Sequence, residues 1–166
     1  MDIWKPSVTV AGVIEKNGKF LLVEEHTAEG LRLNNPAGHL EPGEALDQAC
    51  TREVLEETAH AFLPKALVGI YMSRFVRPAA DGAAAQDITY LRFAFCGELG
   101  PLQTQRSLDT GIVQTLWLTP DEIRASAARH RSPLVLRCME DYLNGQRFPM
   151  GLIHTDASVY DPRQLP

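Results

Sequence analysis

A short run of charged residues near the middle of this 166-residue chain has the composition of a cation-binding site. The run reads REVLEE and occupies residues 52–57. If it is helical, Glu53, Glu56 and Glu57 lie within one turn on one side, because positions three and four apart are neighbours on a helix. Three carboxylates then share one patch of surface.

This arrangement of acids is unfavourable for a helix unless a cation is present. Like charges at these spacings repel each other by about 0.2 to 0.5 kcal/mol per exposed pair. Glu56 and Glu57 also stand near the expected end of the helix, where the macrodipole favours basic residues, and Arg52 alone cannot neutralise three acids. Carboxylate oxygens suit Mg²⁺ or Mn²⁺, and protein-bound Mg²⁺ commonly contacts substrate phosphates as well. The run predicts a divalent-metal site for a phosphate-bearing substrate; the alternative is a solvated acidic helix face.

Residues on both sides extend the pattern. Gly38 is followed after five residues by Glu44, after seven more by residues 52–57, and then by Ala59 and His60. This resembles the signature of the Nudix hydrolases, in which a glycine, a glutamate and REUxEE (U is a bulky aliphatic residue) precede a glycine and another aliphatic. Every charged position of the signature is present at its spacing, and a motif of this length is a specific signal.

Two positions depart from the signature at the end of the expected helix. Ala59 replaces the closing glycine, and His60 replaces the aliphatic residue. A glycine just past a helix end usually adopts a left-handed conformation, which costs a residue with a Cβ on the order of 1 kcal/mol. The sequence therefore predicts a helix end that is shifted or strained, with no ligand lost.

The resemblance implies a set of site residues. The implied metal ligands are oxygen atoms, namely the carbonyl of Gly38 and the carboxylates of Glu53, Glu56 and Glu57. Arg52 fixes the carboxylate of Glu53, and Glu44 pairs with Arg52, so these two complete the catalytic set. The group that accepts the proton from the attacking water is a glutamate of the signature or an acid from a distant loop, for which Glu98 and Asp109 are the candidates.

The strand before Gly38 is implied to take part in substrate recognition. Arg32 and Asn34 are the candidate substrate contacts, with a plain surface role as the alternative. Leu33 stands close to where many members of the family have a tryptophan, so a base-stacking platform is not expected at that position.

Four further segments resemble one bacterial branch of the family; they are residues 5–11, 36–41, 131–135 and 145–149. Members of that branch remove orthophosphate from nucleoside tri- and diphosphates and act on the pyrophosphate of a thiamin pyrimidine precursor. The expected partner is thus a small-molecule nucleotide or another diphosphate. Two alternatives remain open: another Nudix enzyme (an ADP-ribose or dinucleotide pyrophosphatase, or a sanitiser of oxidised nucleotides), or a nucleotide-sensing module. The retained carboxylates favour an enzyme.

The composition is that of an ordinary globular protein, with 45% hydrophobic and 22% charged residues. The net charge of −5 argues against stable nucleic-acid binding, and the absence of a long apolar run argues against membrane insertion. Cys50, Cys96 and Cys138 lack CxxC spacing, which is typical of reduced core residues in a cytoplasmic protein. The sequence fits a monomer or a homodimer equally well.

The hydrophobic pattern predicts a single α+β domain spanning residues 1–166, with a C-terminal helix and tail from about residue 133. Strands are expected at residues 8–14, 20–24, 31–34, 66–76, 88–95 and 112–118. Besides the acidic helix, helices are expected to begin at residues 119–122 and to span residues 133–144, before an extended tail from residue 146. Turns or loops are expected at residues 16–19, 77–87 and 98–101. One mixed sheet between helical layers buries these helices, and the Nudix resemblance implies the same α/β/α sandwich.

Overall fold

The computed structural model describes residues 3–79 and 84–161. Its strands are β1 (Ser7–Gly12), β2 (Glu15–Lys16), β3 (Lys19–Thr27), β4 (Gly30–Asn34), β5 (Ala37–His39), β6 (His60–Arg77), β7 (Gln86–Leu102), β8 (Ile112–Leu118) and β9 (Phe148–Pro149). Its α-helices are α1 (Leu46–Thr58), α2 (Pro120–Ala125) and α3 (Leu134–Leu143), and its 3-10 helices are η1 (Ala127–Arg129), η2 (Met150–Leu152) and η3 (Ala157–Tyr160). None of the helices among the described residues is long and apolar enough to cross a membrane.

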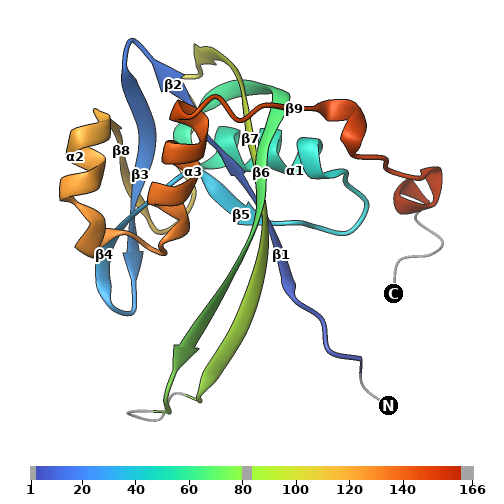
Figure 1. The fold of residues 1–166 in the computed structure, drawn as a ribbon, viewed down its shortest axis with the longest axis horizontal. Coiled ribbons are helices and arrows are strands. Elements are labelled where there is room, and N and C mark those ends of the chain that lie inside the picture. The colour runs from blue at the N-terminus through green and yellow to red at the C-terminus, as the bar shows by residue number, and fades with distance from the viewer. Residues whose placement is uncertain (1–2, 80–83, 162–166) are drawn as a thin grey trace.

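The strands form two sheets (Figure 1). The larger has the order β5-β1-β7-β6-β9 and is mixed, because β1 runs parallel to β7 while its other pairings are antiparallel. The smaller is antiparallel, with β3 between β4 and β8 and with β2 beside it. The predicted mixed sheet and α+β class are confirmed; the separate second sheet was not part of the prediction.

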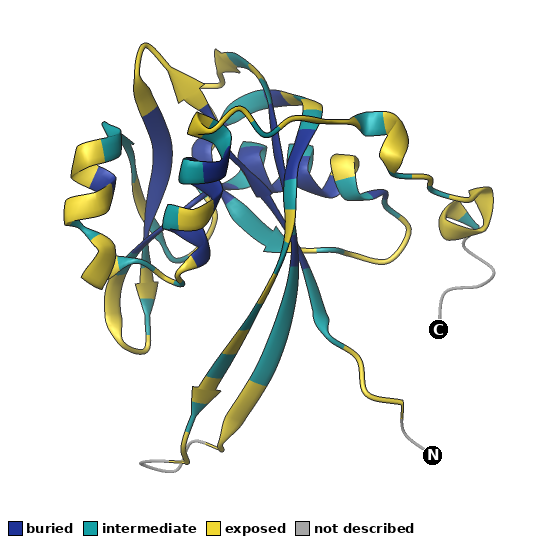
Figure 2. Ribbon diagram, in the orientation of Figure 1, coloured by how far each residue is buried: buried dark blue, intermediate teal, exposed yellow. Residues whose placement is uncertain are grey.

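Apolar side chains pack on both faces of the larger sheet, because neighbouring residues of a strand point to opposite faces. Val10 packs in a cluster with α1, whereas Ala11 packs in a cluster with α2 and α3. Cys50 lies in the first cluster and Cys96 and Cys138 in the second, and all three are free and buried, as predicted. Figure 2 shows these buried segments at the centre, with helices on both sides of the sheet. The sandwich arrangement of the fold is thus the one expected.

The turn predicted at residues 98–101 is wrong, because β7 continues through it to Leu102. Leu99 pairs with Phe62 and Leu102 with His60, so Pro101 falls in a bulge where its missing N–H breaks no ladder bond. The local turn signal of Gly100 and Pro101 was therefore outweighed by pairing with a distant strand.

The loop predicted at residues 77–87 is shorter than expected. Arg77 still belongs to β6 and Gln86 already belongs to β7, and the two are paired. Residues 80–83 lie outside the described part of the chain. The two strands continue together as a long arm beyond the body (Figure 1).

The C-terminal segment agrees with its prediction in outline. Helix α3 ends at Leu143, close to the predicted residue 144, and the tail then packs on the body through β9, which pairs with Ala66 and Leu67 of β6. The tail is not extended throughout, since it contains the short helices η2 and η3.

Candidate metal and substrate site

Helix α1 carries the acidic run and is held at both ends. At its start the N–H of Ala45 donates to Oε1 of Gln48 at 2.9 Å, which supplies half of a capping box. At its end Ala59 has φ of 57° and its N–H donates to the carbonyl of Leu55 at 2.9 Å. Ala59 therefore occupies the left-handed position of the usual glycine, so of the two predicted outcomes the structure shows strain and no shift.

Arg52 lies at the centre of the acidic cluster and contacts its members Glu44, Glu53 and Glu56. Its Nη1 donates to Glu53 at 2.7 Å and to Glu56 at 3.1 Å. Its Nε and Nη2 donate to the two carboxylate oxygens of Glu44 at 3.0 and 2.7 Å, and Nη2 also reaches the carbonyl of His39 at 2.9 Å. The predicted pairing of Arg52 with Glu44 and Glu53 is confirmed. These bonds, led by those to Glu44, hold the pKa of Arg52 above its usual value, so the cation is fixed in the cluster.

Glu57 is a buried carboxyl that Arg52 does not contact. Its exposed fraction is 8%, and its Oε2 accepts a hydrogen bond from the N–H of Ala37 at 2.8 Å. Burial raises the pKa of Glu57 to about 8, and the charges of Glu25 and Glu53 act in the same direction. Burial also raises the pKa of Glu53, against the lowering effect of Arg52. Two acids are therefore buried together, and in the described residues no cation forms a hydrogen bond or ion pair with Glu57, as expected of a site that a cation completes.

Gly38 lies against the carboxylate of Glu53. It is the central residue of β5, where it pairs with Val10 of β1. A Cβ at this position would lie 2.1 Å from the carboxyl carbon of Glu53, so the backbone can approach the carboxylate this closely only without a side chain. The strand β5, which the sequence did not predict, thus presents Gly38 directly to α1.

The residues around Gly38 fit a hard divalent cation. All the candidate ligands are oxygen atoms, and a small cation that takes one or two carboxylates, a carbonyl and several waters needs no closed protein cage. Within the described residues no three Asp, Glu, His or Cys side chains are gathered closely enough to hold a metal by themselves. The reason is visible in the hydrogen bonds: Glu53 and Glu56 turn to Arg52, and Glu57 turns to Ala37.

The candidate substrate residues lie on β4, two positions apart and hence on one face of the strand. Asn34 is 7% exposed; its Nδ2 donates to Glu25 at 3.2 Å, and its Oδ1 accepts from Nη2 of Arg92 at 3.5 Å. Arg32 stands opposite Glu25 in the sheet and is half-buried. Asn34 therefore belongs to a polar network, whereas Arg32 forms no hydrogen bond or ion pair with the described residues.

Arg92 is a residue that the sequence reasoning missed. It lies in β7 and is only 7% exposed, although it carries a charge. The available signal was a single arginine inside the apolar and aromatic run at residues 90–95.

The two loop candidates for proton acceptance lie in different places. The N–H of Asp109 donates to the carbonyl of Glu56 at 2.9 Å, and the charge of Asp109 contributes to the raised pKa of Glu53. Glu98 forms an exposed ion pair with Lys65. Along β7 it lies five residues beyond Phe93, and Phe93 is the residue of that strand that is level with Gly38 across the sheet. That separation is roughly 16 Å along the strand, so the structure brings Asp109 to the acidic helix and leaves Glu98 away from it.

The site and the fold together define a class of protein. The sequence profile of the family described as NUDIX domain matches residues 4–138, which include the whole acidic helix and every candidate ligand. The chain belongs to the Nudix family and is a Nudix hydrolase.

Within that family the chain is similar to particular proteins. It is 39% identical over 152 residues to the phosphatase NudJ of Escherichia coli K12, covering 91% of this chain and 92% of that protein, and equally similar to NudJ of Shigella flexneri. Among solved structures, a NUDIX hydrolase from Nitrosomonas europaea superimposes with a TM-score of 0.82 at 52% identity, covering 92% of this chain and 98% of the other. A UDP-X diphosphatase shares the fold with a TM-score of 0.66 at 17% identity, over 90% of this chain and 68% of that one.

Proposed function

We propose that this chain is a phosphohydrolase that cleaves phosphoanhydride bonds of nucleoside di- and triphosphates, with Mg²⁺ or Mn²⁺ as cofactor. The proposal extends to the pyrophosphate of the thiamin pyrimidine precursor. The observation that carries it is the close approach of Gly38 to Glu53, with the buried Glu57 on the same side of α1. The similarity to NudJ over nine-tenths of both chains supports the phosphatase branch.

The proposed ligands of the metal are the carbonyl of Gly38 and the carboxylates of Glu53, Glu56 and Glu57. When bound, the metal supplies charge neutralisation at the phosphates and acidifies a water. Arg52 keeps its present role in this scheme, because its bonds to Glu44 and to the carbonyl of His39 anchor it while it holds Glu53.

The protein must also take a proton from the attacking water. We assign this task to Asp109, because its loop is tied to the carbonyl of Glu56 and its charge acts at both Glu53 and Glu57. A glutamate of the acidic helix is the alternative acceptor. The Asp109→Asn variant should lose most of kcat, whereas Glu98→Gln should retain nearly full activity. Loss of activity in Glu98→Gln alone would contradict the assignment.

The substrate is proposed to lie against β4, with Asn34 and Arg32 as its contacts. Arg32 has unused donors that suit a phosphate or a sugar hydroxyl, and Asn34 has an amide that suits a base or a carbonyl group.

The remaining parts of the proposal are a small-molecule partner, no stable nucleic-acid binding, and residence in the cytoplasm as a monomer or a homodimer. Three free buried thiols support the reducing compartment.

The test is product analysis on a panel of nucleoside di- and triphosphates, ADP-ribose, a dinucleotide, an oxidised nucleotide and the thiamin precursor pyrophosphate. Each is incubated with Mg²⁺, with Mn²⁺ and with EDTA, and orthophosphate is resolved from pyrophosphate. Orthophosphate release that requires metal is the expected result. A nucleoside monophosphate with pyrophosphate or a sugar phosphate would move the enzyme to another Nudix activity, and nucleotide binding without any turnover would identify a sensor.

A further inference from the structure

Arg92 is a buried cation with unused hydrogen-bonding capacity. Its Nε and Nη1 atoms are buried and have no partner among the described residues, and its Nη2 makes a long bond of 3.5 Å to Asn34. Burying a guanidinium without full pairing is costly, and burial indeed lowers the pKa of Arg92. This unfavourable burial occurs next to β4, against which the substrate is proposed to lie.

The position of Arg92 links it to the proposed site. In the larger sheet Thr9 of β1 lies level with both Arg92 of β7 and His39 of β5, the residue after Gly38. Burial lowers the pKa of Arg92, whereas the neighbouring thiol of Cys138 and then the carboxylates of Glu25 and Glu57 favour its charged form. Arg92 therefore contacts β4 through Asn34 and is close enough to the acidic helix for the charge of Glu57 to act on it.

The chemistry of Arg92 and Glu25 fixes the orientation of the Asn34 amide between them. A guanidinium only donates hydrogen bonds and a carboxylate only accepts them. The carbonyl oxygen of Asn34 must therefore face Arg92, and its NH₂ group must face Glu25, as the distances show. A primary amide has two N–H donors and two lone pairs, so this arrangement leaves one donor and one acceptor for a ligand.

We infer that Arg92 is a positioning residue, which together with Glu25 locks the Asn34 amide so that its remaining donor and acceptor meet the substrate. The inference rests on the proposed function. The substrate group that fits is one with an adjacent acceptor and donor, as on the edge of a nucleobase. Without Arg92 only the bond to Glu25 orients the amide, so its orientation is less strictly fixed, and a flipped amide offers the wrong atom to the substrate.

The test is a double-mutant cycle of Arg92→Met and Asn34→Ala, with kcat and KM measured for nucleoside triphosphates of all four bases. Each single variant should raise KM about tenfold with kcat changed less than about threefold, and the double variant should be no worse than either single one. The ratio of kcat/KM between bases should also change. The conservative Arg92→Lys should recover part of the loss, since it keeps a charged donor.

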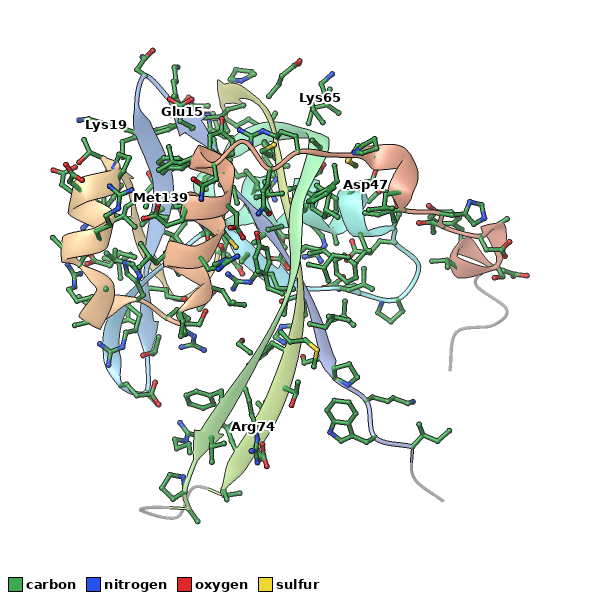
Figure 3. The ribbon with its side chains drawn as sticks, in the orientation of Figure 1. Glu15, Lys19, Asp47, Lys65, Arg74 and Met139 are labelled. Carbon is green, nitrogen blue, oxygen red and sulfur yellow. The ribbon has the colours of Figure 1, made fainter. Side chains whose placement is uncertain are left out.

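Two controls make the outcomes separable. Arg74→Met removes an arginine that is paired with Asp87 on the exposed arm (Figure 3) and should leave KM unchanged. Fully additive effects of Arg92→Met and Asn34→Ala, or an equal loss of kcat for all bases, would overturn the inference in favour of a structural role. If Arg92→Met fails to fold, the cycle is run with Arg92→Lys and judged by the same criteria.

The proposed function is tested separately in the same assay. If the wild-type enzyme turns over none of the nucleotides, the proposed function fails. The same cycle, measured by calorimetry as nucleotide dissociation constants, then decides the role of Arg92: non-additive losses support it, and additive losses overturn it.

Discussion

Substitution of Gly38 by alanine should separate activity from stability. The added Cβ would lie 2.1 Å from the carboxyl carbon and Oε1 of Glu53 and 2.2 Å from its Oε2, whereas ordinary contact begins at 3.4 Å. The carboxylate must therefore move by roughly 1.3 Å, and a misplacement of about 1 Å at a catalytic group can cost about a hundredfold in rate. We expect kcat/KM to fall by about that factor and the bond from Arg52 to Glu53, now 2.7 Å, to break.

The fold should tolerate the same change. Gly38 has an extended backbone without positive φ, which alanine adopts readily, and the group that must move is the end of a flexible side chain. Replacing glycine at a compatible position also lowers the entropy of the unfolded chain, by about 0.4 to 1 kcal/mol. The melting temperature should therefore change by only a few degrees.

Metal-dependent phosphate release and thermal unfolding, measured on the same preparation, check both expectations. Gly151→Ala is the matched control, because its Cβ would meet nothing within 4 Å and its φ is not positive. A Gly38→Ala enzyme with full activity would refute the placement of Glu53 beside β5 in the working site. A large loss of stability would show instead that the backbone, and not the side chain, gives way.

Three further predictions concern the end of α1. Glu57→Gln should lower turnover by about a hundredfold or more while the fold persists, as checked by kinetics and circular dichroism, with the exposed Glu140→Gln as control; near-normal turnover would remove Glu57 from the metal site. Because burial raises the pKa of Glu57 to about 8, the folded metal-free protein holds this proton more tightly than the unfolded chain. The protonated Glu57 then adds to the free energy of unfolding fully below about pH 4.5, and this contribution, on the order of a few kcal/mol, is lost as the pH rises through 8. Urea unfolding in EDTA should show a larger loss in the wild type than in Glu57→Gln, which keeps only the smaller effect of Glu53, and metal affinity should rise over the same range because binding needs the carboxylate; equal pH profiles would contradict the raised pKa. Ala59→Gly should stabilise the protein by about 1 kcal/mol in urea unfolding, since glycine adopts the left-handed position without strain, and a destabilised variant would contradict that geometry.

Features set by neighbouring residues were predictable from the sequence. The turn predicted at residues 16–19 has positive φ at Asn17 and Gly18, and helix α2 begins in the predicted segment 119–122, where the N–H of Glu122 donates to Oγ1 of Thr119 and the N–H of Thr119 donates to the carboxylate of Glu122. The grouping of acids on one side of α1 follows from spacing alone. Each of these depends on at most one helical turn of chain.

Features set by distant pairing were not predictable. The extension of β7 beyond residue 95 depends on bulges in its partner strand, and the short strand β5 depends on β1. In the site, the bond from Ala37 to Glu57 joins residues 20 apart, and that from Arg92 to Asn34 joins residues 58 apart. The signature therefore indicated the candidate ligands, while the groups that orient them became visible only in three dimensions.

The arm formed by β6 and β7 behaves as a separate unit of local stability. Its outer part, from Arg74 to Arg77 and from Gln86 to Thr89, pairs only with itself among the described strands, and all its side chains are partly or fully exposed. Its ties elsewhere are few, such as the 3.7 Å ion pair from Arg77 to Glu29. Amide protons there should exchange through local opening long before the core unfolds. Insertions, deletions or surface substitutions in this arm should therefore have little effect on the acidic helix.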